Sequence, residues 1–151
     1  MQFAVENINE LRGFAKDVLS RSKTPMIFAL SGDLGSGKTT FTKICAEILG
    51  IKQTVNSPTF IIHSEYNLDS GKLHHIDLYR INDLNEFIEL NLNQIIKSKN
   101  YIFIEWADKF KWEINKLSNE ANIVWINFDY IDESDYEPGQ KRIINLTESP
   151  L

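Results

Sequence analysis

A glycine-rich octapeptide at residues 32–39 constrains the fold of this chain more than any other feature. It reads Gly-Asp-Leu-Gly-Ser-Gly-Lys-Thr and fits the phosphate-binding pattern Gly-x-x-x-x-Gly-Lys-[Ser/Thr] at every fixed position. Glycines allow the backbone to wrap closely around an anion and to turn its N–H groups inward. Lys38 supplies a point charge for the outer phosphates, and the Thr39 hydroxyl can ligate Mg²⁺. The octapeptide therefore predicts a site for a nucleoside triphosphate.

The segments on either side of the octapeptide provide the strand–loop–helix setting that this pattern requires. Residues 26–30 form a continuous apolar run, which is typical of a buried parallel strand. After the octapeptide, apolar residues recur with helical spacing as far as Gly50, a helix stop signal. The positive end of this helix is expected to face the anion. The predicted nucleotide-binding residues are Asp33, Leu34, Gly35, Ser36, Gly37, Lys38, Thr39 and Thr40.

Length and composition limit the classes of protein to which the chain can belong. With 151 residues, 42% of them hydrophobic and 25% charged, we expect one folded domain spanning residues 1–151. The single cysteine, Cys45, excludes an intramolecular disulfide and a multi-cysteine zinc site. Without an apolar run of membrane-spanning length or a signal-peptide pattern, a cytoplasmic protein with no membrane partner is expected. The net charge of −5 favours a nucleotide and protein partners over a bare polynucleotide.

The rest of the chain predicts an α/β P-loop NTPase fold built on a central, mostly parallel sheet. Residues 2–5 are expected to form a short strand or an extended lead-in. Apolar runs and alternating patterns predict strands at residues 26–30, 59–66, 73–79, 101–104, 123–130 and 142–146. Helical periodicity predicts helices at residues 8–19, 41–49, 84–96 and 110–117. The strands at 59–66 and 73–79 are expected to form an inserted β-hairpin. The last two strands are expected to pair antiparallel, because their connection is too short for a helical crossover.

Two acidic residues are candidates for the chemistry at the phosphates. Glu105 ends an apolar strand, where P-loop proteins place an acid that holds Mg²⁺; the alternative is a surface acid at a strand end. Asp77 lies within a strand, where aspartate is disfavoured unless a partner stabilises it. It could orient or deprotonate the attacking water or support a Mg²⁺ ligand, or it could be an edge-strand acid facing solvent. We assign Thr39 and Glu105 to the metal, and Lys38, Asp77 and Glu105 to catalysis.

Polar and aromatic residues near these acids each have two interpretations. Thr59 could sense a γ-phosphate with its hydroxyl, or it could be an ordinary strand residue. Trp106 could stack on a ligand or partner, or it could be buried in the core. His74 and His75 are expected to point to opposite faces of a strand, so they cannot bind one metal jointly, and structural roles are expected for both. Trp112 and Trp125 are expected to pack in the interior.

Four segments together resemble a known family. They are Gly-Asp-Leu-Gly-Ser-Gly-Lys-Thr-Thr-Phe at 32–41, Asn-Ser-Pro-Thr-Phe at 56–60, His-Ile-Asp-Leu-Tyr-Arg at 75–80 and Phe-Ile-Glu-Trp-Ala-Asp at 103–108. In order and spacing they are similar to the marker segments of TsaE (YjeE), the small bacterial ATPase of tRNA threonylcarbamoyladenosine synthesis. The length of the chain also matches a member of that family. Together the four segments are far more specific than the phosphate-binding loop alone.

The resemblance implies binding of Mg²⁺ and ATP with weak intrinsic hydrolysis. It also implies association with the TsaD–TsaB pair, which transfers the threonylcarbamoyl group to the adenosine beside the tRNA anticodon. ATP turnover would let that complex cycle, and tRNA would be met only through it. By the same analogy, Thr39 and Glu105 match the metal positions, Asp77 matches the acid needed for hydrolysis, and Trp106 matches the aromatic residue beside the nucleotide or partner surface.

The chain also departs from this family, and two other functions stay open. Asn91 stands where family members often have glycine, and after Asp108 the resemblance is limited to a strand pattern. A small P-loop kinase of a metabolite or nucleoside would usually need an arginine-bearing lid, yet there is no arginine between Arg21 and Arg80. A nucleotide-gated binding module without turnover is the other alternative, because Glu105 replaces the commoner aspartate.

Overall fold

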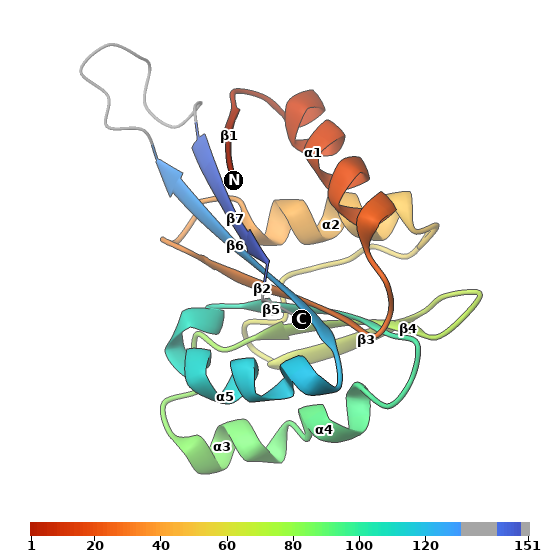
Figure 1. The fold of residues 1–151 in the computed structure, drawn as a ribbon, viewed down its shortest axis with the longest axis vertical. Helices are drawn as coiled ribbons and strands as arrows, with labels where there is room; N and C mark the ends of the chain where they lie inside the picture. The colour runs from red at the N-terminus through yellow and green to blue at the C-terminus, as the bar shows by residue number, and fades with distance from the viewer. Residues whose placement is uncertain (131–141, 149–151) are drawn as a thin grey trace.

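A seven-stranded sheet forms the centre of the structure, and helices cover both of its faces (Figure 1). The computed structural model describes residues 1–130 and 142–148. The strand order is β1–β7–β6–β2–β5–β4–β3. The strands are β1 (Gln2–Val5), β2 (Met26–Gly32), β3 (His63–Asn67), β4 (Lys72–Asp77), β5 (Tyr101–Glu105), β6 (Asn122–Tyr130) and β7 (Arg142–Glu148). The α/β class predicted from the sequence is confirmed.

The helices form two groups, with α1 and α2 on one face of the sheet and α3, α4 and α5 on the other (Figure 1). They are α1 (Ile8–Arg21), α2 (Lys38–Ile48), α3 (Leu84–Glu89), α4 (Leu92–Ile95) and α5 (Lys111–Asn115), with 3-10 turns η1 (Ala107–Phe110) and η2 (Lys116–Asn119) beside α5. Because neighbouring residues of a strand point to opposite faces, each strand contributes to both layers. Phe28 and Phe103 pack with Phe41 of α2, whereas Ile27 and Ile104 belong to the cluster beneath the other helices.

The centre of the sheet is parallel and sets the position of the candidate site. β2 pairs in parallel with both β5 and β6, and β5 pairs in parallel with β4. The register places Glu105 between Leu30 of β2 and Asp77 of β4. Because the carboxyl ends of parallel strands meet at one edge of a sheet, both acids lie beside the loop that follows β2.

Antiparallel pairs complete both edges of the sheet. β3 pairs antiparallel with β4, so the predicted hairpin is confirmed. β6 pairs antiparallel with β7, as expected for the closing strands, and β1 pairs with β7. The connection at residues 131–141 lies outside the described residues.

The hairpin begins later than predicted. β3 starts at His63, and the expectation of a strand from residue 59 is wrong. The N–H groups of Ile61 and Ile62 both donate to the carbonyl of Pro58, which turns the chain instead of extending it. Ile62 has φ 67°, a left-handed conformation that is uncommon for a β-branched residue.

Two expectations for the α3–α5 face of the sheet are also wrong. The helix expected over residues 84–96 is divided into α3 and α4 at Asn91, which has φ 54° and ψ 49°. Asparagine tolerates this left-handed conformation and glycine favours it, so both residues suit the position. Trp112 is not an interior residue, because 67% of it is exposed. The helix expected at 110–117 is observed as the short series η1, α5 and η2.

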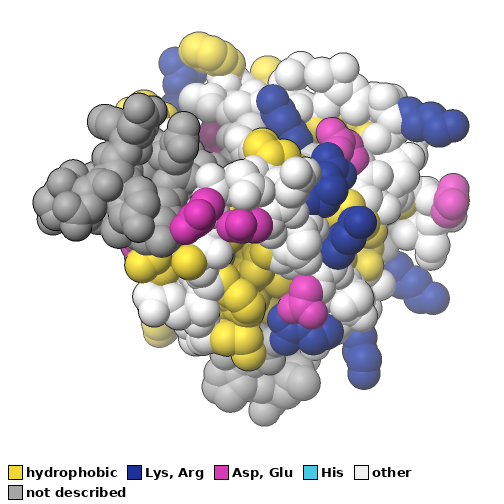
Figure 2. Space-filling view, turned by 90° about the horizontal axis from the view of Figure 1, so that it is seen from above, with side chains coloured by type: hydrophobic (Ala, Val, Ile, Leu, Met, Phe, Trp, Pro, Cys, Tyr) yellow, Lys and Arg dark blue, Asp and Glu magenta, His cyan; other side chains and the backbone are white. Residues whose placement is uncertain are grey.

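The surface shows no large block of positive charge on the face drawn in Figure 2. There, Lys and Arg side chains lie among acidic and uncharged ones. Within residues 1–130 and 142–148, no helix combines the length and the apolar character needed to cross a membrane.

Candidate nucleotide-binding site

A cavity of about 240 Å³ lies where β4 and β5 end, beside the loop between β2 and α2. It is lined by Leu34, Gly35, Ser36, Gly37, Lys38, Thr39, Thr40, Ser57, Thr59, Asp77, Tyr79, Glu105 and Trp106. Of the predicted site residues, only Asp33 is missing from this lining. The Asp33 main-chain carbonyl instead accepts hydrogen bonds from the Ser36 N–H at 3.0 Å and from Lys38 Nζ at 2.9 Å. Asp33 therefore stabilises the loop through its main chain and does not line the cavity.

The loop between β2 and α2 needs glycine at two places. Gly32 has φ 133°, and a Cβ atom there would lie 2.4 Å from the carbonyl oxygen of Phe128 and 2.8 Å from Ser36 Oγ. Gly37 has φ 117° and forms the N-cap of α2. L side chains rarely adopt either conformation. The sharp turn that these residues permit brings the N-terminus of α2, where unpaired N–H groups favour anions, to the wall of the cavity.

Lys38, the first residue of α2, holds a positive charge in a buried position. Its Nζ donates hydrogen bonds to the main-chain carbonyls of Gly32 and Asp33, and lies 4.3 Å from the centre of the Trp106 ring. Burial lowers the pKa of Lys38, while nearby carboxylates, Glu105 foremost, oppose part of that change. The contacts with carbonyls and a ring do not neutralise the ammonium charge. The site therefore retains a cation for a phosphate group.

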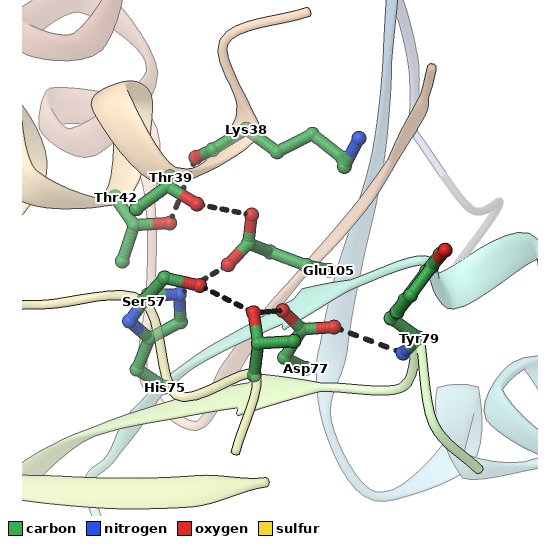
Figure 3. A network of polar contacts seen from close by, with 9 residues as sticks. Lys38, Thr39, Thr42, Ser57, His75, Asp77, Tyr79 and Glu105 are labelled. Atoms are coloured by element: carbon green, nitrogen blue, oxygen red, sulfur yellow. Dashed lines mark hydrogen bonds and ion pairs between the residues drawn. The ribbon is translucent and has the colours of Figure 1, made fainter. Parts of the chain in front are cut away.

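Glu105 is almost fully buried at the cavity wall, with 3% of the residue exposed. Its Oε1 accepts a hydrogen bond from Thr39 Oγ1 at 2.6 Å, and its Oε2 is 2.7 Å from His75 Nε2 (Figure 3). The alternative of a surface acid is therefore wrong. A hydroxyl and a carboxylate side by side are hard oxygen donors of the kind that Mg²⁺ prefers. Since the described residues contain no group of three His, Cys, Asp or Glu side chains that could hold a metal, Mg²⁺ here would also need phosphate or water oxygens.

Asp77 is buried as well, with 3% exposed, and it faces the same cavity. Its Oδ2 accepts a hydrogen bond from Thr59 Oγ1 at 2.8 Å, and its Oδ1 accepts one from the Tyr79 N–H at 2.9 Å. Because Thr59 gives its only hydroxyl proton to Asp77, the 2.8 Å contact between Ser57 Oγ and Thr59 Oγ1 requires Ser57 to be the donor. β4 lies between β3 and β5, so the alternative of an edge-strand acid facing solvent is wrong.

Comparison with known proteins decides the family. The family model described as "Threonylcarbamoyl adenosine biosynthesis protein TsaE" matches residues 5–137. This chain belongs to the TsaE family. The family acts in tRNA threonylcarbamoyladenosine biosynthesis, as the names of its members state.

Individual TsaE relatives agree with this assignment. The TsaE protein of Bacillus subtilis is 41% identical over 107 residues, which cover 71% of this chain and 66% of that protein. The Haemophilus influenzae TsaE protein is 34% identical over 116 residues, covering 77% of this chain and 70% of that one. The crystal structure of YdiB from Bacillus subtilis superposes with a TM-score of 0.66 and 28% identity, covering 98% of this chain and 84% of YdiB.

Three residues of this TsaE site were not assigned to it from the sequence. Ser57 and Tyr79 line the cavity, and His75 contacts Glu105. All three lie inside the segments that carry the TsaE resemblance, which was the available signal. Trp106 lines the cavity too, and its ring centre lies 5.1 Å from that of Tyr79, so the two aromatic residues form one part of the wall.

Proposed function

We propose that this protein is a Mg²⁺-dependent ATPase that allows the TsaD–TsaB complex to cycle during tRNA threonylcarbamoyladenosine synthesis. The observation that supports this most is the meeting of two buried carboxylates, Asp77 and Glu105, with Lys38 around a single cavity. Burying a carboxylate is costly unless it is paired or hydrogen-bonded. Two buried carboxylates at the same edge of the sheet therefore indicate a functional role. Phosphoryl transfer needs these groups, because its catalysis consists mainly of positioning and charge stabilisation.

Each group in the cavity has a separate task in this proposal. Lys38 and the N–H groups at the start of α2 bind the triphosphate. Thr39 and Glu105 would hold Mg²⁺, which when bound supplies positive charge beside the β- and γ-phosphates. Asp77 accepts a hydrogen bond from the attacking water. The oxygen of this water forms a bond to the γ-phosphorus, the bond from that phosphorus to the ADP oxygen breaks, and the proton that the water loses passes to solvent as ADP and phosphate leave. Thr59 holds the Asp77 carboxylate in place for this step.

The TsaD–TsaB pair is the proposed partner, and tRNA is reached only through it. Tight binding of a polynucleotide depends on many phosphate contacts from Lys and Arg. This chain has a net charge of −5, and acidic and uncharged side chains lie between its basic ones on the face in Figure 2. A protein partner that itself binds tRNA fits this charge distribution better than direct binding.

Reconstitution tests the proposal. The TsaD–TsaB complex is supplied with its other substrates and with tRNA in large excess over the complex. Alone it should modify about one tRNA per complex, and it should continue to further rounds only when this protein and ATP are added. A non-hydrolysable ATP analogue should not support further rounds. If the analogue works as well as ATP, the protein is a nucleotide-gated binding module. Rapid transfer of phosphate from ATP to a nucleoside or metabolite would instead identify a kinase.

A further inference from the structure

His75 is a buried group beside the candidate site to which the proposed function gives no role. It lies on β4, two residues before Asp77 and on the same face of the sheet, with none of its surface exposed. Its Nε2 atom is 2.7 Å from Oε2 of Glu105, while Thr39 Oγ1 donates to the other carboxylate oxygen. Figure 3 shows the Glu105 carboxylate between these two partners.

The chemistry of this contact fixes the donor. An ionised carboxylate can only accept hydrogen bonds, so Nε2 of His75 must carry the proton that lies between them. The other ring nitrogen, Nδ1, is buried and has no hydrogen-bond partner among the described residues. A buried polar atom without a partner is unfavourable, and an apolar side chain could fill the same space without that cost. Packing alone therefore does not account for a histidine here, whereas the contact with Glu105 does.

The contact also restricts a motion that would otherwise be free. The last torsion of a glutamate side chain has a broad preference, so packing of the stem does not set the plane of the carboxylate. Contacts at both oxygens do set it. Thr39 is itself a predicted Mg²⁺ ligand, so of the two contacts only that of His75 is independent of the metal.

We propose that His75 is a positioning residue whose Nε2–H orients the Glu105 carboxylate and thereby sets how tightly the site takes Mg²⁺ beside a bound nucleotide. This rests on the proposed function, because it concerns the same metal position. Partners that orient the ligands of a metal commonly change its affinity by about 10–100-fold when removed. The adjacent His74 provides a matched comparison: it is buried, points to the other face and contacts His63 Nε2 at 2.9 Å.

The test measures binding of a fluorescent ADP analogue in excess EDTA and during a Mg²⁺ titration. His75→Leu should leave the affinity in EDTA unchanged and raise the Mg²⁺ concentration for half-maximal effect by about 10–100-fold. His75→Gln places an amide nitrogen as many bonds from Cβ as Nε2 and should stay near wild type. His75→Asn places it one bond short and should behave like His75→Leu. If His75→Leu is the least harmful of the three, packing is the role of this residue and the proposal is overturned.

Two controls separate positioning from general damage. His74→Leu should leave the Mg²⁺ dependence unchanged. Thermal unfolding identifies any variant that does not fold. If His75→Leu does not fold, the comparison of His75→Gln with His75→Asn still tests the proposal. In a Glu105→Ala background, which leaves no side-chain oxygen for the His75 Nε2–H to orient, His75→Leu should add nothing, and an undiminished extra loss there would contradict action through Glu105. A wild-type protein without Mg²⁺-dependent nucleotide binding overturns the proposed function as well. Wild-type binding with normal Mg²⁺ dependence in all His75 variants overturns only the role of His75.

Discussion

The two faces of the sheet handle polar groups differently, and β4 shows this within three residues. On the α2 face, His75 and Asp77 join Glu105 in hydrogen bonds at the edge of the cavity. On the α3–α5 face, Ile76 is fully buried among apolar side chains, and His74 makes polar contacts with His63 and Glu65 of the β3–β4 hairpin. The two buried carboxylates thus lie where hydroxyl and imidazole groups can donate hydrogen bonds to them. Variants of the polar residues at the cavity should therefore alter ligand binding and turnover, and variants of His74 and Asn91 on the other face should alter stability alone.

Removal of Asp77 should produce the largest effect on the α2 face. Asp77→Ala should retain ATP binding and lose about 10²–10⁴-fold in hydrolysis rate, because the attacking water is no longer oriented. Phosphate release and equilibrium binding of ATP measure the two properties separately. Asp69→Ala, at an exposed position in the β3–β4 turn, is the control. Turnover equal to wild type in Asp77→Ala would show that Asp77 does not act on the water.

Removal of the buried cation should come second. Lys38→Ala should weaken nucleotide binding by at least roughly 1.5–3 kcal/mol, or about 10–150-fold, because a charge-assisted contact with the phosphates is lost. Isothermal titration with ADP and ATP provides the measurement. Lys43→Ala, on the exposed side of the same helix, changes the net charge equally and should bind like wild type. Equal losses in both variants would mean that only the overall charge matters.

The site on the α2 face also shows which features the sequence could predict and which it could not. The loop and Glu105 were predictable because their signals are local: fixed spacing in one case, the end of an apolar strand in the other. The partners of the acids were not, because Thr59–Asp77 and His75–Glu105 join residues 18 and 30 positions apart. Such contacts depend on strand register and on a turn at Ile62 that no pattern in the sequence indicates.

Acid should reveal the cost of the buried histidine on the α3–α5 face. Burial, aided by His63, lowers the pKa of His74 to about 4. As the pH falls below 6.5, the unfolded chain takes up a proton at this residue while the folded protein does not until about pH 4. The free energy of unfolding should therefore decrease across this window, by on the order of 1–3 kcal/mol from this residue.

Urea unfolding at several pH values between 7 and 4 measures this effect. Carboxylates titrate in part of the same range, so the informative quantity is the difference between wild type and His74→Gln. The curve for His74→Gln should fall less steeply towards low pH, and nucleotide affinity at pH 7 should be unchanged. Parallel curves for the two proteins would show that His74 does not resist protonation in the folded state.

Asn91, between α3 and α4 on the same side, should give the smallest effect. Its left-handed conformation costs most residues about 1 kcal/mol, whereas glycine adopts it without strain. Asn91→Ala should therefore lower the free energy of unfolding by about that amount, and Asn91→Gly should change it by less than about 0.5 kcal/mol. Asn93→Ala, at an exposed helical position two residues later, controls for loss of the amide. If Asn91→Ala were as stable as Asn91→Gly, the left-handed backbone conformation would not be what determines the stability cost at this position. A change in nucleotide affinity in either variant would show that the α3–α5 face also affects ligand binding.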